Sequence, residues 1–314
     1  MNKISVIGAG RVGETAALYL AAQNRVDEIA LVDIRDGAAQ GAALDIAECA
    51  PLMKFDTRVV GGSDHALLQD SDIIVITAGL PRKPGMSRSD LLQVNLDIID
   101  GLLDGIQQHA PDSILLFVTN PVDIVTYHAL AVTGWPRNRI FGQAGVLDSS
   151  RMATFIKMET GQPIADIETL VMGGHGDTMV PMLRYSSIAG KPLQQFLSED
   201  KLAEIVERTR NGGAEVLGLR EVSSAYDAPG AAVTEMVMAI LQDSKQVLPT
   251  VSLLQGEYGH SDLAIGVPAR LGKQGMEEII QLDMNAEEQT MFDQSAALVK
   301  KDLAMRETLL TASP

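Results

Sequence analysis

The stretch KISVIGAGRVGETAALYLAAQ, residues 3–23, has the clearest structural pattern in the chain. Its apolar beginning predicts a short buried strand, and its second half predicts a helix because it is rich in good helix formers. Between the two, Gly8, Gly10 and Gly13 have the spacing G-x-G-x-x-G, and Asp33 closes the next predicted strand. A glycine triplet by itself is a weak signal. The strand before it, the helix after it and the acidic residue together predict a dinucleotide site.

Each of these residues has a separate physical role. Gly8 permits the tight turn, Gly10 lets the backbone approach a pyrophosphate, and Gly13 lets helix and strand pack closely. The pyrophosphate is expected at the helix N-terminus, where unpaired N–H groups and the helix dipole favour an anion. Asp33 would accept hydrogen bonds from the ribose hydroxyls and repel a 2′-phosphate, which predicts NAD rather than NADP. Arg35, close by, leaves some tolerance of NADP open.

The alternation of strand and helix continues to about residue 145. Apolar strands alternating with helices of this length predict a parallel sheet covered on both faces, which is the Rossmann doubly wound α/β fold. Further strands are expected at residues 28–34, 57–62, 72–79, 113–121 and 139–145, and further helices at 37–49, 89–110 and 122–134.

The pattern changes near residue 146. Helices are expected at residues 149–161, 200–219, 230–243 and 285–310, and strands at 168–174 and, broken by Gly and Pro turns, at 246–272. We therefore predict two domains, an NAD-binding Rossmann domain over 1–145 and a mixed α/β domain over 146–314. The second is expected to pack on the first.

Composition excludes several classes of function. The net charge of −16 and the pI near 4.7 argue against nucleic acid as a partner, because phosphate backbones would be repelled. No apolar run is long enough for a membrane span, and the first strand begins too early for a signal peptide. The single cysteine, Cys49, fits a reducing compartment, so a cytoplasmic location is expected. The five histidines lack ligand spacing, and no metal is expected.

His175 is the most conspicuous candidate for acid–base chemistry. The sequence MGGHGD, residues 172–177, places it between glycines that would let a ligand or another backbone approach. Histidine exchanges a proton near neutral pH, although a lone histidine is more often structural.

Three further positions suggest a ligand cleft. LDSSR places Asp148 and Arg151 three residues apart at the start of a predicted helix, where both side chains can share one face. Alternatively, Asp148 is a helix N-cap and Arg151 a solvated residue. VTNP places Asn120 just past the end of a strand, where open α/β sheets bind ligands, although a plain turn explains it equally.

The stretch LPRKPGMSR, residues 80–88, is unusual in an acidic chain because it holds Arg82, Lys83 and Arg88 and no carboxylate. Two prolines and a glycine make it a loop. By itself it is compatible with a solvated surface turn.

The motifs GAGRVG, LPRKPGMSR, VTNP, GVLDSSR and MGGHGD, in this order and spacing, resemble the lactate/malate dehydrogenase family, and more closely the lactate-dehydrogenase-like branch of malate dehydrogenases. The resemblance extends from residue 3 to about residue 310, and it implies that the domain over 146–314 is the substrate-binding and catalytic domain. It implies reversible hydride transfer between (S)-malate and NAD, giving oxaloacetate and NADH.

The resemblance also implies a role for each site residue. His175 matches the catalytic histidine and Asp148 the acid that orients and stabilises its protonated form; Asp177 is a less favoured partner. Arg151 matches the arginine that binds the carboxylate beside the reacting carbon, and Arg88 the one that polarises the carbonyl. The cofactor contacts implied are Gly8, Ala9, Gly10, Arg11, Val12, Gly13, Asp33, Asn95, Val118, Thr119 and Asn120, the last of which also contacts substrate.

Arg82 is the residue expected to select the substrate. The family member that reduces pyruvate has a neutral glutamine there, and oxaloacetate has one more carboxylate than pyruvate. A closed loop over pyruvate would leave the Arg82 guanidinium buried without a counter-charge, at a cost of about 3–5 kcal/mol. Lys83 is expected to steer anions or to be solvated.

Some alternatives remain open from the sequence. A lactate or broader 2-hydroxy-acid dehydrogenase is the nearest one, and a dinucleotide-binding sensor without catalysis is another. A homodimer or homotetramer is implied, with the apolar helix at 231–241 either at an interface or inside one subunit. Ser223, Ser224 and Ala225 lie near the expected substrate pocket without an assigned role.

Overall fold

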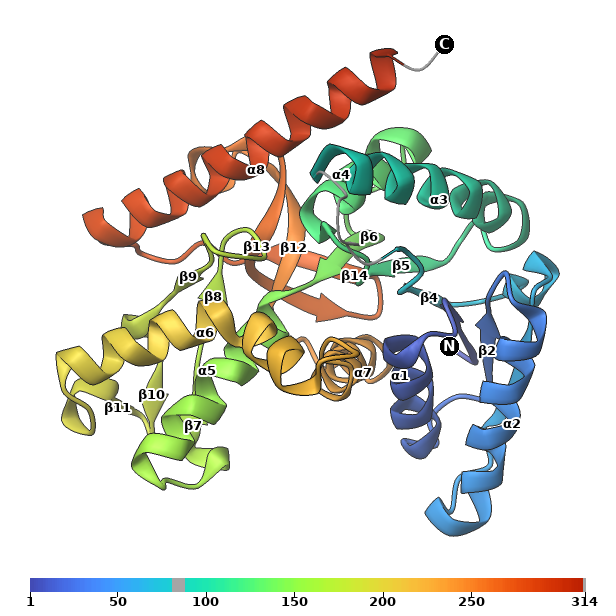
Figure 1. Cartoon of the computed structure of the whole chain (residues 1–314), viewed down its shortest axis with the longest axis horizontal. Helices are drawn as coiled ribbons and strands as arrows, with labels where there is room; N and C mark the ends of the chain where they lie inside the picture. Colours follow the sequence, from blue (N-terminus) through green and yellow to red (C-terminus); the bar gives the residue numbers. More distant parts are fainter. Residues whose placement is uncertain (81–87, 313–314) are drawn as a thin grey trace.

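In the computed structural model, which describes residues 1–80 and 88–312, a nine-stranded sheet runs through the molecule (Figure 1). The strand order is β14-β13-β12-β6-β5-β4-β1-β2-β3. The side chains of Arg88 and Ala312 lie outside this description. The chain leaves β1 in one direction to form β2 and β3 and in the other to form β4, β5 and β6, so the sheet has a switch point beside β1.

Six neighbouring strands of this sheet are parallel and rich in Ile, Val and Leu. Such runs suit a strand that is covered on both faces, and the four residues of β4 and of β5 are all buried. The six strands are β1 (Lys3–Ile7), β2 (Glu28–Val32), β3 (Arg58–Gly62), β4 (Ile73–Ile76), β5 (Ile114–Phe117) and β6 (Ile140–Gln143). The predicted α/β class with a Rossmann sheet is confirmed.

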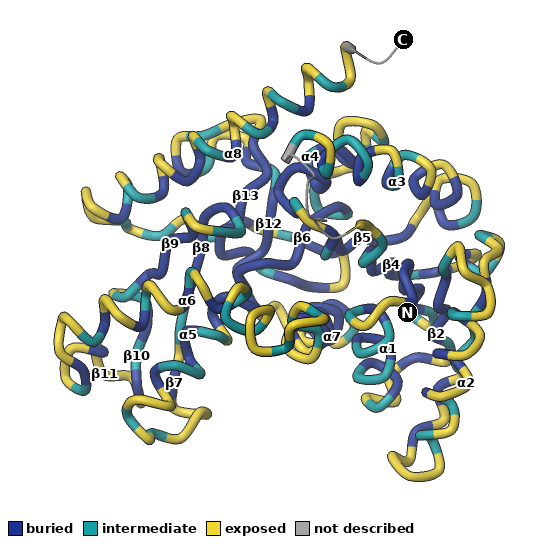
Figure 2. The backbone as a smooth tube through the Cα atoms, in the orientation of Figure 1, coloured by how far each residue is buried: buried dark blue, intermediate teal, exposed yellow. Residues whose placement is uncertain are grey.

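Helices cover both faces of these strands, and most residues of β1, β2, β4, β5 and β6 are buried and therefore dark blue in Figure 2. One apolar core joins the sheet to α1 and α2, and another joins it to α3 and α4. The bounds are α1 (Arg11–Ala22), α2 (Asp36–Met53), α3 (Arg88–His109) and α4 (Val122–Thr133), with a short 3₁₀ turn η1 (His65–Leu68).

Three antiparallel strands extend the same sheet beyond β6: β12 (Val247–Gln255), β13 (Ser261–Gly272) and β14 (Gly275–Ile279). Thr250 pairs with Gln143 and Val251 with Gly142, so β12 covers the edge that β6 would otherwise expose. The sequence predicted strands here but not the sheet they join. The sheet thus crosses the predicted boundary at residues 145 and 146, and that boundary stays a prediction.

The remaining elements pack around this extension. The helices are α5 (Gly145–Thr160), α6 (Glu199–Arg220), α7 (Asp227–Leu241) and α8 (Ala286–Ala312). The short strands are β7 (Ile167–Glu168), β8 (Val171–Met172), β9 (Val180–Pro181), β10 (Ser187–Ile188) and β11 (Lys191–Pro192), and the 3₁₀ turns are η2 (Ile164–Asp166), η3 (Leu183–Tyr185), η4 (Leu193–Gln195) and η5 (Glu257–Gly259).

Helix α7 packs within the chain. Gly230 lies against α1, because a Cβ added there would meet Thr15 and Ala16 at 2.8–3.1 Å. Most of its apolar side chains are buried. Of the two readings of this segment, burial inside one subunit is the one that the structure shows.

Within the part of the chain that is described, none of the helices combines the length and the apolar character needed to cross a bilayer.

Candidate active site

The glycine turn, residues 8–13, lies between the carboxyl end of β1 and the start of α1. Gly8 has φ of +104°, which favours glycine, and its N–H donates to the carbonyl of Val32 at 2.7 Å. A Cβ on Gly13 would lie 1.9 Å from the carbonyl oxygen of Gly8, so only glycine allows this close packing. A Cβ on Gly10 would meet nothing within 4 Å. The open space beside Gly10 and the N-terminus of α1 fit a pyrophosphate.

Asp33 ties the second strand to the glycine turn. Its Oδ2 accepts from the N–H of Ala9 at 2.9 Å, and its Oδ1 accepts from the N–H and the Nε of Arg35 at 2.9 and 3.2 Å. Burial opposes ionisation of Asp33, but these hydrogen bonds outweigh it and lower the pKa of the carboxyl. The carboxylate therefore stays charged beside a cavity of about 290 Å³ that Gly8 and Leu80 also line.

Two of the expected cofactor contacts have side chains that bond to backbone. Asn95 is 1% exposed; its Nδ2 donates to the carbonyls of Asn120 and Leu80, and its Oδ1 accepts from the N–H of Leu80. Thr119 is buried and donates to the carbonyl of Ala78 at 2.6 Å. Asn95 thus holds the ends of two segments that border the cleft. A contact of either residue with the cofactor stays a prediction.

His175 lies in the segment that follows β8, residues 173–178, which we call the catalytic loop. Its Nδ1 is 2.9 Å from Oδ2 of Asp148, and its backbone N–H donates to Oδ2 of Asp123 at 3.0 Å. The preceding N–H, of Gly174, donates to the hydroxyl of Ser295 at 2.8 Å. Three helices, α4, α5 and α8, therefore fix the position of His175.

Asp148 is not the N-cap of α5, the alternative that the sequence had left open. The helix begins at Gly145, which places Asp148 inside its first turns, and its side chain is 2% exposed. One oxygen faces His175, and the other accepts from Nη1 of Arg151 at 3.0 Å. The spacing i, i+3 brings Asp148 and Arg151 to one face of the helix, as predicted.

The charge of Asp148 raises the pKa of His175. Burial of the imidazole opposes this effect, while the hydrogen bond to Asp148 and the charge of Asp123 support it. A carboxylate facing Nδ1 favours the tautomer with a proton there, which leaves Nε2 to accept and release a second proton. Among the described residues, none bonds to Nε2.

Asp123, on α4, is a part of the site that the sequence reasoning missed. Burial raises its pKa to about 6, although the N–H of His175 favours its charged form, and its Oδ1 is buried without a partner among the described residues. In the sequence it is one of several acids in the first turn of a helix, a common position that carries no sign of a distant partner. Only the fold brings it to His175.

A cavity of about 500 Å³ brings most of the candidates together. His175 and Arg151 line it with Asn120, and Asp177 is at its wall without a hydrogen bond to the imidazole among the described contacts. Arg210, which the sequence reasoning also missed, lines it from α6. The remaining lining residues include Val12, Val118, Ser224 and Ala225.

Three predicted cations, Arg82, Lys83 and the side chain of Arg88, lie outside the described residues. Their roles stay predictions. The backbone of Arg88 begins α3.

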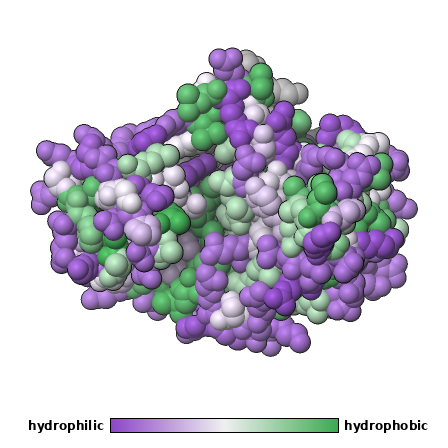
Figure 3. Space-filling view, turned by 90° about the horizontal axis from the view of Figure 1, so that it is seen from below, coloured by the Kyte–Doolittle hydropathy of each residue, from purple (hydrophilic) through white to green (hydrophobic). Residues whose placement is uncertain are grey.

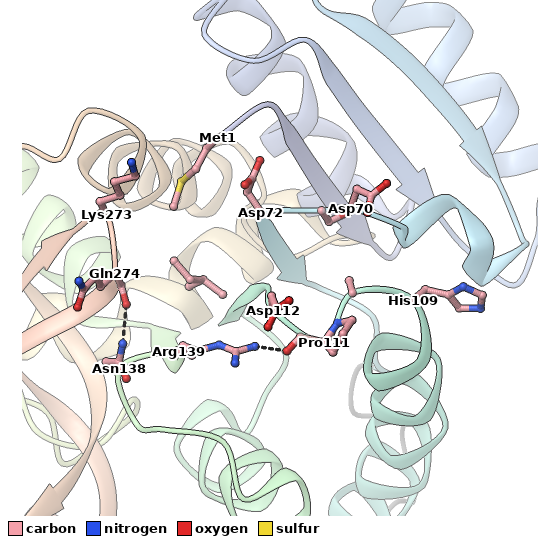
Figure 4. A pocket seen from close by; sticks show the side chains of 13 residues that line it. Met1, Asp70, Asp72, His109, Pro111, Asp112, Asn138, Arg139, Lys273 and Gln274 are labelled. Carbon is pink, nitrogen blue, oxygen red and sulfur yellow. Dashed lines mark hydrogen bonds between the residues drawn. The ribbon is translucent and has the colours of Figure 1, made fainter.

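A third cavity, of about 480 Å³, lies on the far side of the sheet from the carboxyl ends of the parallel strands (Figure 4). Met1, Asp72, Asp112 and Arg139 border it at the amino ends of the parallel strands, where ligands of this fold class do not bind. The Arg139 guanidinium is engaged by the carbonyls of Pro111 and Ser113. We therefore assign the chemistry to the cavity beside His175.

No three His, Cys, Asp or Glu side chains gather as ligands for a metal ion among the residues that the structure describes. His175 shares its cavity with Val12 of the glycine turn, and an imidazole beside a dinucleotide turn is the arrangement of an NAD-dependent oxidoreductase.

Comparison with known proteins gives the family. The lactate/malate dehydrogenase NAD-binding domain matches residues 2–142, and the alpha/beta C-terminal domain of the same family matches residues 145–309. The chain belongs to the lactate/malate dehydrogenase family, which confirms the resemblance seen in the sequence and NAD as the cofactor.

Relatives of known name support this membership. A malate dehydrogenase of Thioalkalivibrio sulfidiphilus is 60% identical over 303 residues, covering 96% of this chain and 99% of that one. The structure of malate dehydrogenase from Salinibacter ruber is 44% identical with a TM-score of 0.95, covering 99% and 100%. A lactate dehydrogenase of Cryptosporidium parvum, solved with lactic acid and nicotinamide adenine dinucleotide, is 36% identical with a TM-score of 0.93, covering 100% and 99%.

Proposed function

We propose that the chain catalyses the reversible oxidation of (S)-malate to oxaloacetate with NAD. The observation that supports this is the arrangement of His175, Asp148 and Arg151: one buried carboxylate holds both an acid–base imidazole and a guanidinium at one cavity. A proton acceptor beside a carboxylate-binding group is what a 2-hydroxy acid requires. The curated relatives cited above are named malate dehydrogenase.

In the proposed mechanism the residues bind, orient and deprotonate the substrate. Arg151 binds the carboxylate beside the reacting carbon through two parallel hydrogen bonds, and Asn120 contacts the substrate at the strand end. Nε2 of His175 takes the hydroxyl proton, and Asp148 stabilises the imidazolium that forms. Bound NAD supplies the acceptor for the hydride that leaves the same carbon. In the reverse direction protonated His175 returns the proton to the carbonyl oxygen.

Substrate choice is assigned to Arg82 and activation of the carbonyl to Arg88. Both assignments rest on the sequence, because these side chains lie outside the described residues. Arg82 would neutralise the far carboxylate of malate, and a monocarboxylate would leave it without a counter-charge.

A lactate dehydrogenase is the second candidate, since a lactate dehydrogenase has nearly the same fold as this chain. The experiment is the decay of absorbance at 340 nm with NADH and either oxaloacetate or pyruvate, repeated with NADPH. We expect kcat/KM for oxaloacetate to exceed that for pyruvate by about 100-fold or more, which is the effect of one stranded charge. A preference for pyruvate would contradict the proposal and the role of Arg82.

We further propose a cytoplasmic homodimer or homotetramer that acts in the tricarboxylic acid cycle. Figure 3 shows apolar side chains gathered in patches between hydrophilic ones on one face of the molecule. Exposed apolar residues include Leu44, Leu52 and Met53 on α2 and Leu219 on α6, and such residues suit a subunit contact. Sedimentation equilibrium at micromolar concentration tests the assembly; a monomer there would contradict it.

A further inference from the structure

One face of α6 forms a wall of the cavity beside His175. Arg210, Gly213, Ala214 and Leu217 line the cavity at the helical spacing i, i+3, i+4 and i+7, so they share one face. Arg151 lies against this face: a Cβ added to Gly213 would be 3.6 Å from Nη2 of Arg151. Arg210 is one helical turn before Gly213 on the same face. The guanidinium groups of Arg151 and Arg210 therefore border one cavity.

The two arginines differ in how they are paired. Arg151 has a 3.0 Å hydrogen bond to the buried Asp148. Arg210 has a long 3.5 Å contact from Nε to the carbonyl of Met179 and a 3.9 Å contact with Glu207, whose side chain is 69% exposed. Contacts of that length and exposure stabilise little. Among the described contacts, most N–H groups of Arg210 are left for a ligand.

The charges around the cavity favour an anion at Arg210. The carboxylate of Asp148 already faces both His175 and Arg151. Asp177 also lines the cavity, but it is exposed and has no ion pair with Arg210 among the described contacts, so solvent screens its charge. The whole chain carries −16 and repels a dianionic substrate over long distances. A cation in the wall counteracts that repulsion where the substrate enters.

We propose that Arg210 is a substrate-capture residue, which binds a carboxylate of the incoming dicarboxylate and brings it to Arg151. The dicarboxylate nature of the ligand rests on the proposed function; the anion site itself rests on the two arginines. Because the contact is made on entry and not only in the transition state, its loss raises KM and leaves kcat nearly unchanged.

The test compares Arg210→Gln and Arg210→Lys with a matched control, Arg208→Gln. Arg208 is on the same helix but bonds to Glu215 at 2.6 and 2.9 Å and stacks on Phe155, so it does not line the cavity. For oxaloacetate reduction we expect Arg210→Gln to raise KM about 5–10-fold with kcat within about two-fold, and to weaken the salt dependence of kcat/KM. Arg210→Lys should retain most of the affinity, and the control should match the wild type.

A second measurement separates this inference from the proposed function. Malonate binding to the enzyme–NADH complex, followed by NADH fluorescence, reports the anion site whichever substrate is turned over. We expect Arg210→Gln to weaken malonate by a factor similar to its KM effect. Unchanged malonate affinity in Arg210→Gln would show that Arg210 is only a structural link from α6 to Met179. Equal losses of kcat and of thermal stability in Arg210→Gln and Arg210→Lys would show the same. A wild type that prefers pyruvate would contradict the proposed function while malonate still tests Arg210.

Discussion

The glycine turn and the catalytic loop are both short glycine-containing segments after a strand, but they are held in opposite ways. The glycine turn bonds mainly within its own βαβ unit: Ala9 to Asp33, 24 residues away, and Gly8 to the end of β2. Beyond that unit, the carbonyl of Gly8 accepts from the hydroxyl of Thr77 at 3.0 Å. The catalytic loop bonds to residues 27, 52 and 121 positions away, Asp148, Asp123 and Ser295. The glycine turn thus depends mainly on nearby sequence, whereas the catalytic loop depends on contacts from the whole fold.

The largest test breaks the catalytic loop at its central contact. Asp148→Asn removes the charge that raises the pKa of His175 and that orders Arg151, so we expect kcat/KM for oxaloacetate to fall by about 10²–10⁴-fold. Steady-state rates measure this, and circular dichroism checks that the variant is folded.

Asp177→Asn is the matched control, because Asp177 lines the same cavity without bonding to the imidazole among the described contacts. A change of less than about three-fold is expected there, within the range of surface substitutions. If Asp177→Asn were the more damaging variant, Asp177 would be the partner of His175 and the assignment of Asp148 would be wrong.

The second test separates packing from binding in the glycine turn. Gly13→Ala places a Cβ 1.9 Å from a backbone oxygen, so we expect about 1–3 kcal/mol of destabilisation in urea unfolding. In Gly10→Ala the new methyl group meets nothing within 4 Å, so the stability of the protein should be unchanged. The methyl group occupies the space expected for the pyrophosphate, so the affinity for NADH should fall about ten-fold or more. Equal NADH affinity in Gly10→Ala and the wild type would contradict the role given to Gly10.

This contrast explains which parts of the molecule the sequence could predict. The alternation of strands and helices in the first half, the glycine turn and Asp33 follow from periodicity and local chemistry, and the structure has each strand and helix near its expected place. His175 was identified by its glycines. Asp148 and Arg151 were placed on one helix face by their spacing.

The rest depended on contacts that no local pattern encodes. Nothing in the sequence of β12 says that it pairs with β6, and nothing near Asp123 points to an N–H 52 residues away. The bond from Asn95 to the carbonyl of Asn120 is of the same kind. The sequence around Arg210 does not distinguish it from other charged residues, because a helix with alternating charges normally indicates a solvated surface.

The third test measures the electrostatic part of the catalytic loop. Asp123→Asn removes a negative charge that raises the pKa of His175, so that pKa should fall. In the proposed mechanism, oxaloacetate reduction needs protonated His175 and is lost as pH rises through this pKa. Malate oxidation needs the neutral form and is lost as pH falls through it. Both limbs should therefore move to lower pH in kcat/KM profiles. The difference from wild type should shrink below about pH 6, where Asp123 itself is protonated.

Ser295→Ala is the control for this test. It removes the hydrogen bond to the N–H of Gly174 without changing charge, so it should lower the rate without moving either limb. Identical shifts in both variants would mean that Asp123 acts through loop geometry alone.

The smallest test addresses the contact between the two halves. His128 on α4 is 1% exposed; its Nε2 is 2.7 Å from Asp100 on α3, and its Nδ1 accepts from Nε of Arg306 on α8 at 2.9 Å. Burial lowers the pKa of His128, and the Arg306 charge adds to this, against the opposing charge of Asp100. The folded protein therefore resists a proton that the unfolded chain accepts.

The sign of the effect follows from that difference. Above the pKa of His128 in the unfolded chain, about 6.5, the imidazole is neutral in both states and its contribution to stability is fully present. This contribution is lost as pH falls toward the lower pKa of the folded protein, at up to about 1.4 kcal/mol per pH unit. His128→Gln keeps an amide donor and acceptor but does not titrate. Between pH 7.5 and 5.5, urea unfolding should show that the wild type loses about 1 kcal/mol more free energy of unfolding than this variant. The other titrating groups contribute equally to both proteins. Helices α3 and α4 precede residue 145 and α8 follows it, and the three meet at His128. A single unfolding transition whose midpoint changes in His128→Gln would mean that the two parts of the chain, before and after residue 145, unfold together. Two transitions, with only one sensitive to the substitution, would show that these two parts unfold separately although one sheet runs through both.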